Sequence, residues 1–196
     1  MRESGLRPDA FIFLGLLSSC THLASCDLEK RVHAHLIRTR NNILTTENSL
    51  MDMYFRCGGI KYARGVFEAM ANRDTISWNT EIESSNNFED SVKTVREMLT
   101  GLQKPDEVTF IVLLKATGEA TEWRLGLSIH AIVTKKAFDC FDIVKTVLIS
   151  TYAKCGNLDC CVGLVYCVEK KSLISYSAMI NAYGIQGKGK EAMEVL

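Results

Sequence analysis

The sequence predicts an all-α fold built from stacked pairs of antiparallel helices, because it repeats itself and its apolar residues follow helical spacing. Residues 48–58, NSLMDMYFRCG, reappear as residues 146–156, TVLISTYAKCG, at an offset of 98 (146 − 48 = 98). Residues 32–34, VHA, reappear as residues 129–131, IHA, at an offset of 97 (129 − 32 = 97). A short helical repeat cannot bury its apolar face alone, so neighbouring repeats must stack.

The composition limits the kinds of function to consider. The 196-residue chain is 47% hydrophobic, and its 23 basic side chains balance 23 acidic ones. No apolar run reaches the roughly 18 residues that a membrane-spanning helix needs. The neutral balance lacks the strong positive charge typical of many nucleic-acid-binding domains, but charge can also segregate to one face. In a repeat array we expect function on a surface spread over several repeats.

The eight cysteines favour neither a disulfide framework nor a metal site. No Cys-x-x-Cys occurs, and the four histidines do not stand at zinc-ligand spacing from cysteine pairs. We therefore expect no metal and no cofactor. Cys57 and Cys155 recur at matching positions, which predicts that they are small buried residues packed between helices.

The long repeat divides into shorter units, each predicted to form two antiparallel helices. In one of them Leu50, Met53 and Tyr54 share a helix face, and Gly58 ends that helix. The predicted units form a single array: residues 1–9 (partial), 10–43, 44–74, 75–106, 107–141, 142–172 and 173–196 (partial).

One unit is shorter than its counterpart. Three residues near positions 182–184 have no equivalent near positions 83–87. This deletion of almost one helical turn predicts a local irregularity at residues 84–87, and a continuous helix from Thr75 through Leu99 would refute it.

Several recurring segments resemble the pentatricopeptide repeat family of land plants. They are GLRPD at 5–9, LMDMY at 50–54 with CG at 57–58, DTISWN at 74–79, PDEVTF at 105–110 and YAKCG at 152–156. The resemblance covers essentially the whole chain. The repeat units follow the order long, short, standard, and this order resembles the mixed-length PLS subclass of the family. Since the chain begins and ends within repeats, we expect it to be a fragment.

The resemblance implies a right-handed α-solenoid of helix-turn-helix repeats that binds single-stranded RNA in a mitochondrion or chloroplast. In such proteins one repeat reads about one base through two or three side chains. The implied partners are single-stranded organellar RNA and other RNA-editing or processing proteins, with no membrane. The chain lacks the His-x-Glu and Cys-x-x-Cys elements of zinc deaminases, so we predict no catalytic residues and no enzymatic activity.

The resemblance also assigns base reading to the fifth residue of the first helix and the last residue of each repeat. It implies that an Asn/Asp pair favours a pyrimidine, usually uridine. An asparagine amide offers both a donor and an acceptor, and a carboxylate can hold its orientation. The implied reading residues are Asn48 with Asp74, Asn79 with Asp106, Thr146 with Ser172, and Ser177. Thr146 with Ser172 departs from the usual pairs, so we assign it no base.

Second-position residues clamp bases by stacking in this family. The implied set is Thr45, Ile76, Ile143 and Ile174, with Phe11 and Val108 at the same position of the long units.

Several residues of the recurring segments can also serve the fold alone. Asp74 and Asp106 precede helix starts, where N-capping accounts for them without RNA. Trp78 is interpreted as a packing residue rather than a stacking platform. His33 and His130 recur on the inner stripe of a second helix, which favours a structural role.

The leading functional prediction is sequence-selective RNA binding, as part of an organellar RNA-processing or C-to-U editing factor. The alternative is a protein-binding solenoid scaffold with degenerate RNA-reading positions, and a relic without function is a third possibility.

Overall fold

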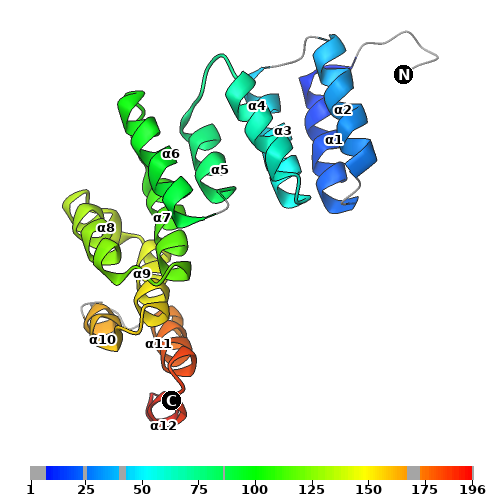
Figure 1. Ribbon diagram of the computed structural model, residues 1–196. Helices are drawn as coiled ribbons and strands as arrows, with labels where there is room; N and C mark the ends of the chain where they lie inside the picture. Colours follow the sequence, from blue (N-terminus) through cyan, green and yellow to red (C-terminus); the bar gives the residue numbers. More distant parts are fainter. Residues whose placement is uncertain (1–7, 24–25, 40–42, 86, 167–172, 196) are drawn as a thin grey trace. The chain divides into compact units, whose positions relative to one another are not determined.

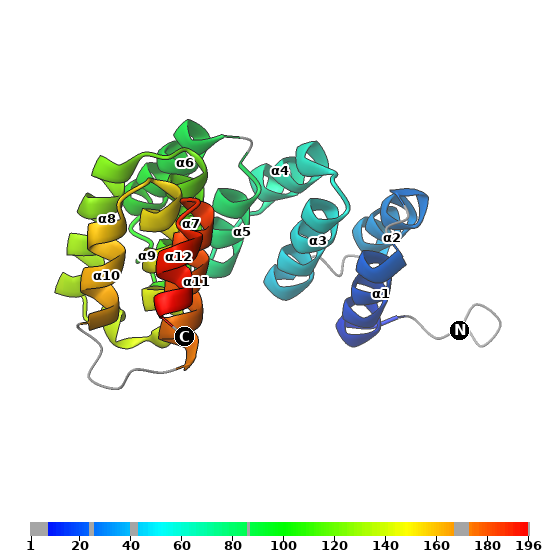
Figure 2. The same ribbon diagram turned by 90° about the horizontal axis from the view of Figure 1, so that it is seen from below.

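The computed structural model describes residues 8–23, 26–39, 43–85, 87–166 and 173–195, and within these ranges the chain is helical with no strand (Figures 1 and 2). This confirms the predicted all-α class. The first helices of the successive pairs are α1 (Ala10–Leu23), α3 (Leu44–Arg56), α5 (Thr75–Glu83), α7 (Glu107–Glu119), α9 (Asp142–Lys154) and α11 (Leu173–Ile185). The second helices are α2 (Cys26–Thr39), α4 (Ile60–Ala69), α6 (Phe88–Thr100), α8 (Trp123–Lys135), α10 (Leu158–Tyr166) and α12 (Gly189–Glu194). None of the described helices has the length and apolarity needed to cross a membrane.

The helices form two compact units, one of residues 1–86 and 94–103 and the other of residues 87–93 and 104–196. In the first unit α3 packs against α1 on one side and α5 on the other, while α2 and α4 pack beside their own first helices. In the second unit α9 occupies the same kind of position between α7 and α11. The central first helix of each unit is therefore covered by its neighbours.

The apolar stripe predicted for the second complete repeat is buried. Leu50, Met53 and Tyr54 of α3 have almost no exposed surface, and Ala63 and Phe67 of α4 are buried with them. Removing this apolar surface from water stabilises the stack by roughly 1.5–3 kcal/mol for each large side chain.

Glycine ends the equivalent helices α3 and α9. Gly58 has φ 79° and Gly156 has φ 77°, in the left-handed region that glycine adopts without steric cost. After α3, the N–H of Gly58 donates to the carbonyl of Phe55 and the N–H of Gly59 to that of Tyr54. The predicted glycine turn is confirmed.

The third complete repeat has a shortened first helix. α5 contains 9 residues, whereas α3, α7, α9 and α11 each contain 13. It ends at Glu83, Ser84 is its C-cap, and α6 begins at Phe88. The predicted irregularity at residues 84–87 is confirmed.

The prediction that Cys57 and Cys155 are buried residues packed between helices is wrong. They are the C-cap residues of α3 and α9, and both are partly exposed. Their matched position therefore belongs to the helix end that precedes the glycine, where a small side chain fits beside the turn.

A histidine–tyrosine contact occurs in each compact unit. His33 Nδ1 of α2 lies 3.0 Å from the Tyr54 hydroxyl of α3, and His130 Nδ1 of α8 lies 2.9 Å from the Tyr152 hydroxyl of α9. In both pairs the rings meet edge to face. Burial lowers the pKa of both imidazoles and raises the pKa of Tyr54 to about 12. The structural role predicted for the two histidines is confirmed.

These contacts predict a loss of stability in mild acid. Because burial lowers the pKa of His33 and His130 in the folded chain, the unfolded chain binds more protons as the pH falls through about 6.5. The free energy of unfolding should therefore decrease between about pH 7.5 and about pH 5.5, as measured by urea denaturation.

The double variant His33→Gln/His130→Gln should lose the part of this pH dependence that the histidines cause, whereas His35→Gln, at an exposed position, should keep it. An unchanged slope in the double variant would show that other groups cause the effect.

Candidate functional site

Asp74 is the N-cap of α5 and forms a reciprocal capping box with Ser77. The backbone N–H of Ser77 donates to Asp74 Oδ1 over 2.9 Å, and the backbone N–H of Asp74 donates to Ser77 Oγ over 2.8 Å. An acidic residue followed three positions later by a hydroxyl residue satisfies two otherwise unpaired N–H groups in this way. The capping role left open by the sequence is therefore present.

The same carboxylate also binds Asn48, from the middle of α3. Asn48 Nδ2 donates to Asp74 Oδ1 over 3.1 Å and to Oδ2 over 3.2 Å. These are the two residues that the resemblance pairs as base readers of one repeat, and the fold brings them together although 26 positions separate them. Capping and the contact with Asn48 thus coexist on one side chain.

Asp74 is held as a carboxylate. Burial acts to raise its pKa, but hydrogen bonds from the Ser77 backbone, the Asn48 amide and the Ser77 hydroxyl outweigh burial, so the pKa lies below its usual value. A carboxylate can only accept, so it faces the Nδ2 end of the Asn48 amide and leaves Oδ1 pointing elsewhere.

Asn48 Oδ1 has no hydrogen-bond partner among the described residues. The residue is only 8% exposed, and Oδ1 itself is buried. A buried acceptor without a partner costs about 1–3 kcal/mol. The arrangement provides an oriented acceptor beside a fixed negative charge.

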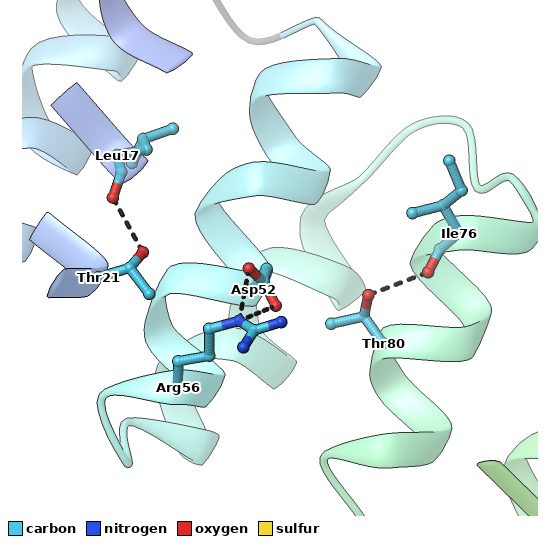
Figure 3. Close-up of polar contacts among 6 residues, drawn as sticks. All are labelled: Leu17, Thr21, Asp52, Arg56, Ile76 and Thr80. Atoms are coloured by element: carbon cyan, nitrogen blue, oxygen red, sulfur yellow. Dashed lines mark hydrogen bonds and ion pairs between the residues drawn. The ribbon is translucent and has the colours of Figure 1, made fainter. Parts of the chain in front are cut away.

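Besides this pair, the first helices α1, α3 and α5 carry an apolar side chain, hydroxyls and charges that Figure 3 draws. Figure 3 shows Asp52 and Arg56 of α3 lying between Thr21 of α1 and Ile76 and Thr80 of α5. Arg56 Nε lies 2.8 Å from Asp52 Oδ1, and the Arg56 side chain is 61% exposed while that of Asp52 is 46% exposed. Ile76, one of the predicted stacking residues, is 61% exposed.

The other predicted stacking residues are placed as follows. Thr45 is exposed on α3, and Ile143 is 61% exposed on α9. The side chain of Ile174 lies outside the described residues. An isoleucine left this exposed has apolar surface available for contact with a ligand, but stacking itself stays a prediction.

The remaining predicted readers differ from one another. Asn79 is buried on α5, and Asp106 caps α7 through the backbone N–H of Thr109 at 2.9 Å. Since Asn79 and Asp106 belong to different compact units, their pairing stays a prediction.

The hydroxyls of Thr146 and Ser177 donate to carbonyls of their own helices, at Asp142 and Leu173, each over 2.8 Å. Ser172 lies outside the described residues.

Trp78 is a packing residue, as predicted. It is buried and meets the Phe67 ring edge to face, with ring centroids 4.9 Å apart. Among the described residues, no three His, Cys, Asp or Glu side chains gather as metal ligands.

Comparison with known proteins identifies the repeat. The sequence model of the PPR repeat matches residues 48–74, 143–173 and 174–196. In Arabidopsis thaliana, the pentatricopeptide repeat-containing protein At3g63370, chloroplastic, is 32% identical over 191 residues, covering 95% of this chain and 20% of that protein. The mitochondrial protein At4g31070 is 30% identical over 203 residues, covering 100% of this chain and 32% of that protein.

The chain contains pentatricopeptide repeats and is similar over its length to these plant proteins. It spans between 20% and 32% of the length of these two curated relatives.

Solved structures share the fold of this chain. The crystal structure of the pentatricopeptide repeat protein PPR10 in complex with an 18-nt psaJ RNA element matches with a TM-score of 0.76 at 20% identity, covering 100% of this chain and 30% of that one. PPR10 from maize matches with a TM-score of 0.61 at 15% identity, covering 99% of this chain and 34% of that one. The predicted helical-repeat fold is confirmed.

Ser77, which makes four hydrogen-bond contacts with the proposed reader Asp74, is not among the site residues predicted from the sequence. A local signal does mark it, because an acidic residue followed three positions later by Ser or Thr occurs at 74–77 and at 106–109. The hydroxyl at the third helix position is thus recognisable as part of a capping box before the fold is known.

Two substitutions at Asp74 should separate capping from charge. Asp74→Ala removes the cap and should lower the free energy of unfolding by about 1 kcal/mol, whereas Asp74→Asn keeps an oxygen acceptor and should cost much less. Urea denaturation near neutral pH measures both. If Asp74→Asn is as destabilised as Asp74→Ala, the charge of the carboxylate, rather than its capping geometry, stabilises α5.

Proposed function

We propose that this chain binds single-stranded RNA and that Asn48 with Asp74 reads one base. The observation that carries the proposal is the Asn48 amide, which is held by the Asp74 carboxylate while its own Oδ1 is buried without a partner among the described residues. Oδ1 accepts from a base N–H, and the second hydrogen of Nδ2 donates to a base oxygen or nitrogen. Family resemblance favours uridine as that base.

The surroundings of this pair suit a nucleotide. Thr45 and Ile76 are exposed on α3 and α5, where an apolar side chain can cover the face of an unstacked base. Arg56 is exposed and paired with the neighbouring Asp52 of its own helix. An exposed ion pair of this kind contributes at most about 1 kcal/mol, so a phosphate can compete for the guanidinium.

The affinity of this chain alone should be low. One good bidentate base contact gives about 1–3 kcal/mol of discrimination, whereas association costs on the order of 4–15 kcal/mol. Two Asn/Asp pairs, Asn48 with Asp74 and Asn79 with Asp106, are proposed as complete readers here. Binding should therefore be weak and should fall steeply with salt.

The wider role is an RNA-processing or C-to-U editing factor of a mitochondrion or chloroplast, acting as a binding array without catalysis. The names of the relatives At3g63370, chloroplastic, and At4g31070, mitochondrial, support an organelle. The order of long, short and standard repeats supports the PLS subclass.

A protein-binding scaffold is the second candidate function. α8 carries two large apolar side chains, one helical turn apart, that remain partly exposed, Trp123 and Leu127. Such a surface suits contact with another protein better than contact with phosphates.

The substitution Asn48→Ser tests base reading. It removes the oriented amide, so the preference for uridine-rich over adenosine-rich single strands should fall by about five- to tenfold, since a base contact gives about 1–3 kcal/mol. Fluorescence anisotropy at low and moderate salt measures both affinities. Asn72→Ser, at an exposed asparagine between α4 and α5, is the control and should retain the preference.

Equal binding of both strands by the native chain, with no effect of Asn48→Ser, would show that base reading is wrong. Binding of a protein partner without binding of either RNA would favour the scaffold.

A further inference from the structure

The third residue of the first helix carries a hydroxyl in α3, α5 and α7, at Thr46, Ser77 and Thr109. Each hydroxyl accepts from the backbone N–H of the residue before the helix, over 3.1 Å, 2.8 Å and 3.1 Å respectively. At the start of α3 that residue is Ile43, which itself has no carboxylate, and the Thr46 hydroxyl donates to the Ile43 carbonyl over 2.9 Å. Ser77 and Thr109 also reach the carboxylate of the capping aspartate.

Ser77 Oγ lies 3.1 Å from Asp74 Oδ1 and 2.8 Å from the Asp74 carbonyl oxygen. The Ser77 hydroxyl can therefore donate its hydrogen bond to either oxygen. Oδ1 of Asp74 thus has three donors within reach, which are the Ser77 backbone, the Ser77 hydroxyl and the Asn48 amide. Ser77 is fully buried, so no bulk water competes for these positions.

Capping alone does not require this hydroxyl. Asp9 caps α1 through a hydrogen bond from the backbone N–H of Ile12 over 3.0 Å, and the third residue of that helix has no hydroxyl. Thr46, in turn, stabilises the start of α3, where the capping residue has no carboxylate. The hydroxyl and the carboxylate occur together at Asp74 and Asp106, the two aspartates that family resemblance assigns to base reading.

We propose that Ser77 is a positioning residue of the base-reading pair, whose hydroxyl fixes the rotation of the Asp74 carboxylate and thereby the orientation of the Asn48 amide. This inference rests on the proposed function. Asn48 Oδ1 is the buried acceptor without a partner among the described residues, and its direction depends on which way the carboxylate turns the amide. Selectivity for a base then depends on a residue that need not touch RNA.

The lowered pKa of Asp74 is consistent with the contacts from Ser77 to Asp74 and from Asp74 to Asn48. The Ser77 backbone, the Asn48 amide and the Ser77 hydroxyl together overcome the effect of burial. Loss of the hydroxyl removes one of these donors and should raise the pKa of Asp74.

The test compares the native chain with Ser77→Ala, Ser77→Thr and Ser128→Ala. Thr occupies the equivalent position at Thr46 and Thr109, so Ser77→Thr should restore the contact. Ser128 bonds the Arg124 carbonyl of its own helix and serves as the matched hydroxyl deletion. Two quantities are measured, the ratio of affinities for uridine-rich and adenosine-rich strands by anisotropy, and the pKa of Asp74 by NMR titration without RNA.

Ser77→Ala should lower the affinity ratio by about three- to tenfold, within the range of one base contact, and should raise the pKa of Asp74. Ser77→Thr and Ser128→Ala should keep the native ratio. In the Asn48→Ser background, Ser77→Ala should change the ratio no further, because both residues act through one amide. If Ser77→Ala does not fold, Ser77→Cys replaces it, with a similar size and a much weaker donor.

A native ratio in Ser77→Ala would overturn the positioning role. A further drop of the ratio in the Asn48→Ser background would overturn the proposed route through Asn48. A native chain that does not distinguish the two strands would instead refute the proposed function, and this inference with it.

Discussion

The central first helix of each compact unit buries its apolar side chains against the first helices of the neighbouring repeats and against second helices, and the rest of the unit depends on this packing. α3 lies between α1 and α5, and α9 lies between α7 and α11. Tyr54 and Tyr152, at equivalent places in these central helices, are fully buried, and each also binds a histidine from the second helix of the preceding repeat. Packing therefore fixes where each first helix lies and which of its faces remains available.

The packing of α3 against α5 brings a polar pair together where two repeats meet. Asn48 comes from α3 and Asp74 starts α5, so the distance between them depends on the packing of these two helices. Asp74 acts twice, since its carboxylate caps α5 and also binds the Asn48 amide. A displacement of α5 along α3 would break the contact with Asn48, whereas the cap, which Asp74 and Ser77 form within α5, would stay intact. Base reading, as proposed, is consequently coupled to the stacking that stabilises the array.

Sequence reasoning predicted the helical pairs because helical periodicity and glycine turns are local signals. It predicted the shortened α5 from a missing turn, and the resemblance to the pentatricopeptide repeat family implied a partnership of Asn48 with Asp74. It did not predict that Asn48 Oδ1 lacks a partner among the described residues, since burial of one atom depends on neighbouring helices. It also placed Cys57 and Cys155 in the core, because recurrence shows that a position is constrained without showing what constrains it.

The two copies of the repeat differ at the proposed reading position while their packing residues agree. Tyr54 with His33 corresponds to Tyr152 with His130, but Asn48 corresponds to Thr146, whose hydroxyl donates to the carbonyl of Asp142 in its own helix. At this position an amide can be exchanged for a hydroxyl while the histidine–tyrosine contact is kept, because the shorter side chain finds a backbone partner within its own turn. The buried contacts hold the scaffold constant, and the proposed base selectivity could therefore change one repeat at a time.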